Sequence, residues 1–350
     1  MGIHYPNHNK RKMTPLVSII IPFYNSASFL EDAVISVVTQ SCNFEAIFID
    51  DGSEDDGFKI VEKYLADNSR IKLIRQDNQG ANRARANGVH EATGEWIVFL
   101  DADDVLLDSF SEIINKWCRK FDGDVIVTYN ELLPIKEDHT IDAETYRRGI
   151  LTQKIHTGPW CKIYKRSLFS KFVFDIPSSI ISAEDYIMNI RLAFNVNHDV
   201  LMTKDNYYKC RSDANPQSAM KTFKGSEEYD RMYRKYYEAS FNSSDREKYR
   251  RLILQWYLSR WHQKYRKVHN IQMDSYETEL FREILQQIKI CNYKLSFAEY
   301  CNLNLKNPFC RMVMDYCLRI SGAIHRYAKQ IKKSNDYERR ILLYNSISSQ

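Results

Sequence analysis

One short stretch, residues 95–107, limits most strongly what this chain can fold into. Five apolar residues, Trp96 to Leu100, run directly into three carboxylates, Asp101, Asp103 and Asp104. An unbroken apolar run of this length is typical of a strand that is buried on both faces, as in parallel sheets. Open α/β sheets bind ligands at the carboxyl ends of their strands. The stretch therefore predicts an inner strand of a parallel sheet that ends in an acidic site.

Three carboxylates within four residues repel one another, and positive charge nearby would offset this. A helix start is the alternative interpretation, because acids favour the first turn and Asp is a common cap. One acid would suit a helix start, but three in four positions favour a hard divalent cation. Mg²⁺ commonly takes one or two protein carboxylates together with phosphate oxygens.

The segments around this stretch alternate between apolar runs and helical spacing. Strands are expected at 16–21, 44–49, 71–74 and 96–100, and helices at 28–40, 53–66 and 81–92. Pro22 is expected to end the first strand, since proline cannot donate to a central ladder, and Gly94 to end the third helix as a left-handed cap. This alternation predicts a parallel, doubly wound sheet, with its polar loops along one edge.

The pattern continues with less regular elements. A helix is expected at 109–121, a strand at 124–129, a polar excursion with a strand or two at 130–157, a helix at 184–194 and strands at 200–202 and 207–210. Helices then follow at 226–270, 276–292, 296–303 and 309–332. The predicted organisation is a disordered basic arm at 1–14, an α/β domain at 15–215 and a helical region at 216–350.

Charge is placed unevenly along the chain. Residues 1–215 hold 25 Lys and Arg against 31 Asp and Glu, whereas residues 216–350 hold 25 against 14. The basic, aromatic-rich second part predicts contact with something anionic, such as a membrane surface, although a solvated helical appendage or a homodimer contact explains it equally well. The eight cysteines form no Cys-x-x-Cys pair and no apolar run approaches a membrane span, which favours a cytoplasmic protein.

Four motifs together resemble the family 2 glycosyltransferases. They are Val17-Ser-Ile-Ile-Ile-Pro-Phe-Tyr-Asn25, Phe48-Ile-Asp-Asp-Gly-Ser53, Asn78-Gln-Gly80 with Ala84-Arg85, and Phe99-Leu-Asp-Ala-Asp-Asp104. The resemblance covers about residues 15–212. It implies a GT-A fold, an inverting mechanism, a Mn²⁺ or Mg²⁺ ion and a nucleotide-sugar donor that is UDP-linked. One departure is Ala86, where the family often has Asn.

The resemblance assigns roles to individual positions. Asp51 matches the acid that binds the uracil N3–H, and Tyr24 matches the ring that stacks on uracil. Asp101 matches the first acid of an Asp-x-Asp motif near the ribose and sugar, and the metal falls to Asp103 or to Asp104. The other donor-side residues are Pro22, Asn25, Gln79, Gly80 and Arg85.

Acceptor-side motifs are matched by Gly158 to Arg166 and by Ala183-Glu184-Asp185. Asp185 matches the catalytic base, with Glu184, Trp160 and Lys162 on the acceptor side. Without the resemblance, the first turn of a helix is the favoured interpretation of Glu184 and Asp185, and Trp160 fits a core position as well as a sugar contact.

The function implied is transfer of a sugar from a UDP-sugar to a glycan or lipid-linked acceptor in bacterial envelope or capsule synthesis, at the inner face of the plasma membrane if the basic part binds lipid. Nucleic acid is not an expected partner. The alternatives are a catalytically silent nucleotide-sugar-binding or scaffold protein and a sugar-1-phosphate nucleotidyltransferase. The last would need a glycine-rich phosphate loop, and residues 18–28 contain no glycine.

Overall fold

The computed structural model describes residues 14–66, 68–130, 133–211, 226–265 and 275–296, together with residues 299, 300, 303 and 310. Contacts divide the chain into two compact units, 1–242 and 243–350, which are described separately. The predicted arm at 1–14 and the helix predicted at 309–332 lie almost entirely outside the described residues, and the helix predicted at 296–303 lies partly outside them.

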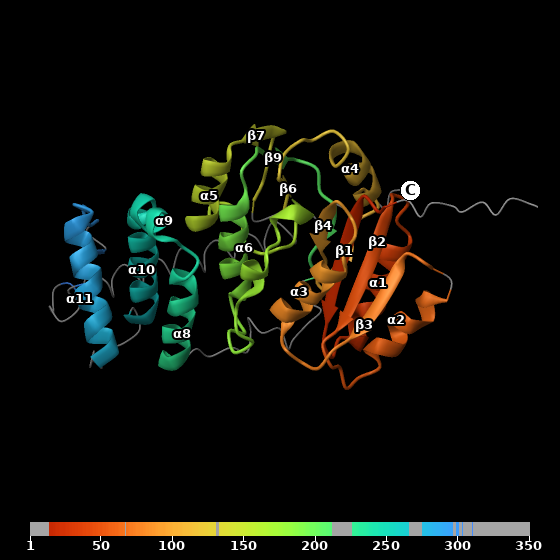
Figure 1. The fold of residues 1–350 in the computed structure, drawn as a ribbon, viewed down its shortest axis with the longest axis horizontal. Helices are drawn as coiled ribbons and strands as arrows, with labels where there is room; N and C mark the ends of the chain where they lie inside the picture. Colours follow the sequence, from red (N-terminus) through yellow and green to blue (C-terminus); the bar gives the residue numbers. More distant parts are fainter. Residues whose placement is uncertain are drawn as a thin grey trace, which may run out of the picture. The chain divides into compact units, whose positions relative to one another are not determined.

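Four parallel strands form the first half of the main sheet (Figure 1), as the alternation predicts. They are β1 (Val17–Phe23), β2 (Phe44–Asp50), β3 (Ile71–Arg75) and β4 (Trp96–Phe99). Their order across the sheet is β3-β2-β1-β4, and each neighbouring pair runs parallel. Every residue of β1 and β2 is buried, which is why both segments are largely continuous apolar runs.

The second half of the sheet mixes strand directions. After β4 come β8 (Lys162–Lys165), β6 (Val125–Thr128), β9 (Val200–Thr203) and β7 (His139–Ile141). β8 runs antiparallel to both β4 and β6, β6 runs parallel to β9, and β7 runs antiparallel to β9. The sheet is therefore largely parallel rather than wholly so, and β8 is a strand that the sequence analysis did not assign.

Helices cover both faces of the parallel strands. α1 (Ala27–Val38) and α2 (Gly57–Leu65) contact each other, and Leu30 and Val34 of α1 share a core cluster with Ile19 and Ile21 of β1. Ile20 faces α3 (Ala81–Glu91) instead, because successive strand residues point to opposite faces. A Cβ on Gly88 would lie 2.4 Å from Ile20 Cγ2, so the glycine allows α3 to approach the sheet closely.

The remaining elements of the first unit lie around this framework. They are β5 (Val105–Leu106) paired with β10 (Tyr208–Lys209), the helices α4 (Phe110–Trp117), α5 (Ala143–Leu151), α6 (Glu184–Asn195) and α8 (Glu227–Glu238), and the 3-10 turns η1 (Arg166–Leu168) and η2 (Lys171–Phe174). α6 confirms the predicted helix. The excursion at 130–157 contains the strand β7, as expected, and also α5, which was not predicted.

Pro22 does not end β1 as expected. It pairs with Ile49 of β2, and the strand continues to Phe23. β4 pairs with β1 only as far as Ile20, whose carbonyl accepts the Leu100 N–H. In a strand, the backbone N–H and C=O groups of alternate residues point toward the same neighbouring strand. Pro22 therefore faces the β4 side, as Ile20 does. Because β4 has ended before this point, the N–H that Pro22 lacks has no place in the ladder.

Gly94 is likewise not the left-handed cap that its position suggests, since its φ is not positive. Its N–H donates to Ser18 Oγ at 2.9 Å, and a Cβ at this residue would lie 2.7 Å from the Ser18 backbone nitrogen. Gly94 therefore allows the chain entering β4 to approach β1.

A buried arginine joins α6 to the segment around η2 and to α8. Arg191 is 2% exposed, and its Nη1 donates to the carbonyls of Phe172 and Asp175 at 2.7 and 2.8 Å. Its Nε donates to Ser240 Oγ at 3.2 Å, just beyond α8. Burial lowers the pKa of Arg191 to about 10, so the guanidinium stays charged at neutral pH.

Arg191→Met is expected to lower the free energy of unfolding by about 2–4 kcal/mol, because two buried carbonyls lose their donor. The comparison is Arg119→Met, an exposed arginine whose loss should change stability by about 0.5 kcal/mol or less. Urea unfolding followed by tryptophan fluorescence measures both. Equal midpoints for the two variants would contradict the structural role of Arg191.

The second unit contains α9 (Ser243–Lys248), α10 (Arg250–Tyr265) and α11 (Ser275–Ile290), and α10 packs against the other two. The unit begins at residue 243, so α8 lies in the first unit although the sequence analysis placed residues 216–350 together. None of the helices among the described residues has the length and apolar character needed to cross a membrane.

Candidate active site

The loops after β1 and β2 are joined through Asn25. Its backbone N–H donates to Ser53 Oγ at 3.0 Å, and its side-chain oxygen accepts the Glu54 N–H at 2.8 Å. Asn25 has φ 46°, a left-handed conformation that asparagine adopts more readily than most residues. The adjacent Tyr24 is 47% exposed, so its ring is open to a flat ligand.

Asp51, which follows β2, organises the loop after β3. Its Oδ1 accepts from Gln76 Nε2 at 2.8 Å and from the Gln79 N–H at 2.9 Å, and its Oδ2 accepts the Gly80 N–H at 2.8 Å. Gly80 has φ 85°, which favours glycine at this position. A carboxylate offers about four lone-pair sites, so three protein donors leave room for one donor from a ligand.

Arg85 of α3 connects the acids of the two predicted subsites. It is 6% exposed, and its Nη2 lies 3.1 Å from Asp101 Oδ1 while its Nη1 lies 3.4 Å from Glu184 Oε1. Burial would lower the pKa of Arg85, but Asp101, Glu184 and Asp185 raise it above its usual value. Its Nε is buried and has no hydrogen-bond partner in the structure. One guanidinium therefore contacts both Asp101, which is predicted to lie on the donor side, and Glu184, which is predicted to lie on the acceptor side.

Asp185 lies in the first turn of α6, beside this arginine. Burial and the neighbouring Glu184 raise the pKa of Asp185 to about 6, although Arg85 opposes the shift. At neutral pH the carboxylate is mainly ionised and more basic than an ordinary Asp, as a general base requires. The preceding Ala183 has φ 60°, a left-handed conformation that is costly for alanine, and its carbonyl accepts from Tyr233 Oη at 3.1 Å.

The three acids after β4 have different surroundings. Asp101 faces Arg85, and Asp103 is half-buried. Asp104 is 7% exposed, and its two oxygens accept the Tyr208 hydroxyl and the Arg211 N–H, each at 2.7 Å. Burial raises the pKa of Asp104 to about 6.

These surroundings bear on which acid could hold a metal. Asp104 accepts two donors from the protein, and burial makes it more easily protonated than usual, so it is poorly suited to hold a cation. In the described part of the chain, no three Asp, Glu, His or Cys side chains are grouped as a ligand set. One or two carboxylates are what Mg²⁺ takes when phosphate oxygens supply further ligands. Of the two carboxylates predicted for the metal, Asp103 therefore remains the candidate.

Two residues that the sequence analysis did not single out hold the acidic loop in place. The Tyr208 hydroxyl also lies 3.3 Å from the Asp101 N–H, and Arg211 Nε donates to the Asp103 carbonyl at 2.7 Å. Arg211 further donates to the Phe29 carbonyl of α1 at 3.0 Å and pairs with Asp32. Nothing local in the sequence marks these residues, since their partners lie more than 100 positions away.

The predicted acceptor-side residues differ in exposure. Trp160 is half-buried and lies between His156 and Tyr208, with ring centroids 4.2 and 5.8 Å away. Lys162 is 1% exposed, and its Nζ donates to the Gly158 carbonyl at 2.5 Å. Burial lowers the pKa of Lys162 to about 8, while Asp185 opposes the shift. Lys162 is therefore placed to act on the site through its charge rather than by direct contact.

Comparison with known sequences matches this region to one family. The glycosyl transferase family 2 model matches residues 18–175. "Putative glycosyltransferase EpsH" of Bacillus subtilis is 27% identical over 203 residues, covering 52% of this chain and 56% of that protein. "Cholesterol galactosyltransferase" of Borreliella burgdorferi is 36% identical over 176 residues, covering 44% and 49%. The chain thus spans about half the length of these curated relatives.

Solved structures agree on the fold. S. aureus TarS 1-349 in complex with UDP-GlcNAc has a TM-score of 0.53 at 18% identity, covering 82% of this chain and 78% of that one. A second TarS 1-349 structure has a TM-score of 0.51 at 19% identity, covering 77% and 87%. Residues 18–175 are thus similar to glycosyl transferase family 2, and the chain shares its GT-A fold with the TarS structures.

Proposed function

We propose that this protein transfers a sugar from a UDP-sugar to a hydroxyl group of a glycan or lipid-linked acceptor, with inversion at the anomeric carbon, in cell-envelope polysaccharide synthesis. The observation that carries the proposal is Arg85, whose guanidinium lies 3.1 Å from Asp101 and 3.4 Å from Glu184, next to Asp185. A donor-side acid and the proposed base are thus held at one centre. The relative TarS is described with UDP-GlcNAc, which supports a UDP-linked donor.

The donor would lie over the loops after β1, β2 and β4. The exposed Tyr24 ring would stack on uracil, and the lone pair left on Asp51 would accept the uracil N3–H. Asp101 would contact the ribose or the sugar. A divalent cation held by Asp103, when bound, supplies positive charge that stabilises the departing diphosphate.

In the transfer step, Asp185 takes the proton from the acceptor hydroxyl as its oxygen bonds to the anomeric carbon. The bond between this carbon and the diphosphate oxygen breaks on the opposite face, and its electron pair leaves with UDP. Attack opposite to the leaving group inverts the configuration. The pKa of Asp185, raised to about 6, leaves the carboxylate ionised at neutral pH but basic enough to accept the proton.

UDP is expected to bind weakly without Mn²⁺ or Mg²⁺, because Asp101 and Asp103 repel the diphosphate. Asp103→Ala should remove most of the metal dependence. Asp104→Asn is the control, because Asp104 accepts hydrogen bonds from Tyr208 and Arg211. This replacement should lower the stability of the protein, while the metal dependence of UDP binding remains. Titration calorimetry with and without metal measures the affinities. Equal UDP affinity in both conditions for the unmodified protein would refute the metal assignment.

A silent nucleotide-sugar-binding protein is the competing interpretation, and donor hydrolysis or transfer distinguishes the two. A panel of nucleotide sugars is first tested for thermal stabilisation, since a ligand that binds the native state raises its stability. Each stabilising donor is then incubated with candidate acceptors, and released UDP is measured. Stabilisation by a donor, without UDP release for any acceptor or water, would favour the silent protein.

A further inference from the structure

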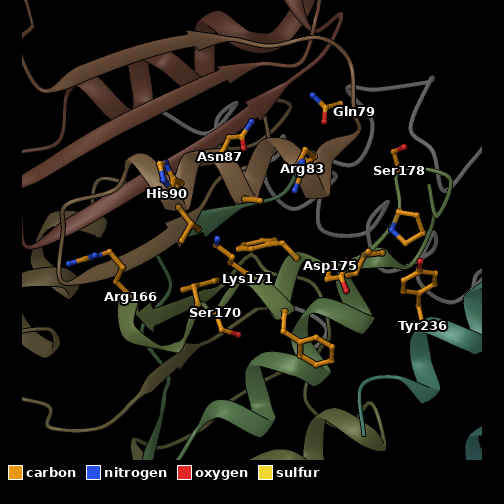
Figure 2. A pocket seen from close by; sticks show the side chains of 17 residues that line it. Gln79, Arg83, Asn87, His90, Arg166, Ser170, Lys171, Asp175, Ser178 and Tyr236 are labelled. Carbon is orange, nitrogen blue, oxygen red and sulfur yellow. The ribbon is translucent and has the colours of Figure 1, made fainter.

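A groove runs beside α3, on the side away from the parallel sheet. It has a volume of about 1040 Å³ and lies between α3 and residues 166–178, which include η1 and η2. Figure 2 shows Arg83, Asn87 and His90 entering from α3, with Arg166, Ser170, Lys171 and Asp175 entering from the facing segment. Tyr236 of α8 lies near the end marked by Asp175 and Ser178. Two residues of the predicted motifs line the groove: Gln79 of the donor side and Arg166, the last residue of the acceptor-side motif.

The charged groups that face the groove are mainly cationic. Arg83, Lys171 and Arg166 are exposed, and His90 adds a fourth basic group, whereas Asp175 is the acid among the lining residues. Within the described residues, the side chains of Arg83 and Lys171 have no ion-pair partner, while Arg166 Nε donates to the Gly94 carbonyl. Two cations from opposite walls are therefore available to an anion in the groove.

The wall opposite α3 is aromatic and firmly held. Phe169 and Phe174 stack with ring centroids 5.8 Å apart and an interplanar angle of 10°. Phe172 lies over the Arg191 guanidinium at 4.3 Å, and the same arginine binds the carbonyls of this segment. Aromatic surfaces with a few fixed polar groups are typical of a site for a specific ligand rather than of a merely charged surface.

One end of the groove adjoins the active site. Gln79 lines this end, and its N–H is bound by Asp51 of the donor side. A Cβ on Gly80 would lie 4.0 Å from the Cβ of Ser178, on the facing segment. From Ser178 the chain leads directly to Asp185 at the start of α6. A chain-like ligand whose end reaches Asp185 could therefore continue into the groove.

We propose that the groove binds an acidic stretch of the acceptor glycan, several sugar units away from the hydroxyl that is glycosylated; this rests on the proposed function. Carboxylates of the glycan would pair with Arg83 and Lys171, and its sugar rings would lie against the phenylalanines. Arginine binds carboxylates through two parallel hydrogen bonds, which gives such a site selectivity. A hollow lined by both walls suits a narrow chain better than the flat surface of a membrane.

The test uses the full chain and a defined probe, tetragalacturonate, with maltotetraose as its neutral counterpart. Fluorescence anisotropy of the labelled sugars measures binding, and UDP affinity is measured on the same samples. The variant is Arg83→Glu with Lys171→Glu. Its control, Lys120→Glu with Lys154→Glu, makes the same change of net charge at exposed lysines outside the groove.

Tetragalacturonate is expected to bind more tightly than maltotetraose. The groove variant should weaken its binding by about tenfold or more, since two attractive contacts become repulsive, while the control variant and UDP affinity stay near wild type. Three results would each overturn the proposal. They are equal binding of the two sugars, an equal effect of the two variants, and binding to anionic vesicles without binding to the acidic sugar. If the unmodified protein does not bind UDP, the donor site is refuted instead. The groove proposal is judged separately, because the sugar-binding measurement does not use UDP.

Discussion

Asp185→Asn is expected to lower the rate of sugar transfer by about 10²- to 10⁴-fold while leaving UDP affinity near that of the wild-type protein. The substitution keeps the size of the side chain but removes the group that accepts the proton. In the proposed mechanism Asp185 acts on the acceptor, and it lies outside the loops that would hold the donor, so donor binding should not depend on it. Transfer by the two proteins is measured at saturating donor, with UDP affinity determined in parallel.

Glu184→Gln is the matched control for this substitution. It neutralises the residue directly before Asp185, and the glutamine oxygen can still accept the hydrogen bond from Arg85. Its effect on transfer should therefore be much smaller. Wild-type transfer by Asp185→Asn, or a loss explained wholly by weaker donor binding, would show that another acid is the base.

The Asp185→Asn variant should also be more stable than the wild-type protein at neutral and alkaline pH. Burial raises the pKa of Asp185 to about 6, above the value of 3.8 for an unperturbed Asp, so the native state binds this proton more tightly than the unfolded state. The stabilisation from proton binding is full below pH 3.8 and is lost as the pH rises through 6. Asp185→Asn should thus gain about 1–3 kcal/mol at pH 8 and little near pH 4.

Arg85→Met is expected to reduce transfer by about 10²-fold or more and to destabilise the first unit by about 3–5 kcal/mol. The substitution preserves much of the side-chain volume but leaves Asp101, Glu184 and Asp185 without their shared cation. Repulsion among these acids would then disturb both subsites together. Transfer rates, UDP affinity and urea unfolding are all measured for this variant.

Arg85→Lys keeps the charge and is more certain to fold, so it separates the electrostatic role of Arg85 from its geometry. A lysine cannot reach two acids with a planar fork, and it should recover stability better than it recovers transfer. Because Arg85 opposes the rise in the pKa of Asp185, the acidic limb of the pH–rate profile should move to higher pH in Arg85→Met and less in Arg85→Lys. An unchanged profile in Arg85→Met would mean that Arg85 does not act on the base.

The sequence by itself determined the parallel half of the fold and the loops that carry the donor-side acids. Strands β1, β2 and β4 are buried on both faces, so each is a largely continuous apolar run that can be recognised without knowledge of its neighbours. The helices between them have apolar residues at helical spacing, and the polar loops then fall at one sheet edge by topology alone. Asp51 and Asp101 were accessible in this way, with the family resemblance supplying their proposed roles, whereas Asp185 was singled out by the resemblance alone.

Tertiary structure alone decided how these parts meet. β8 is a four-residue segment with lysine at both ends, and it is a strand because β4 and β6 supply backbone partners on either side. Arg85 and Glu184 are 99 positions apart, and their contact depends on the packing of α3 against the sheet. The groove beside α3 likewise joins residues 79–90 to residues 166–178. Local propensity acts over a few residues, whereas pairing and burial act between segments that only the folded chain brings together.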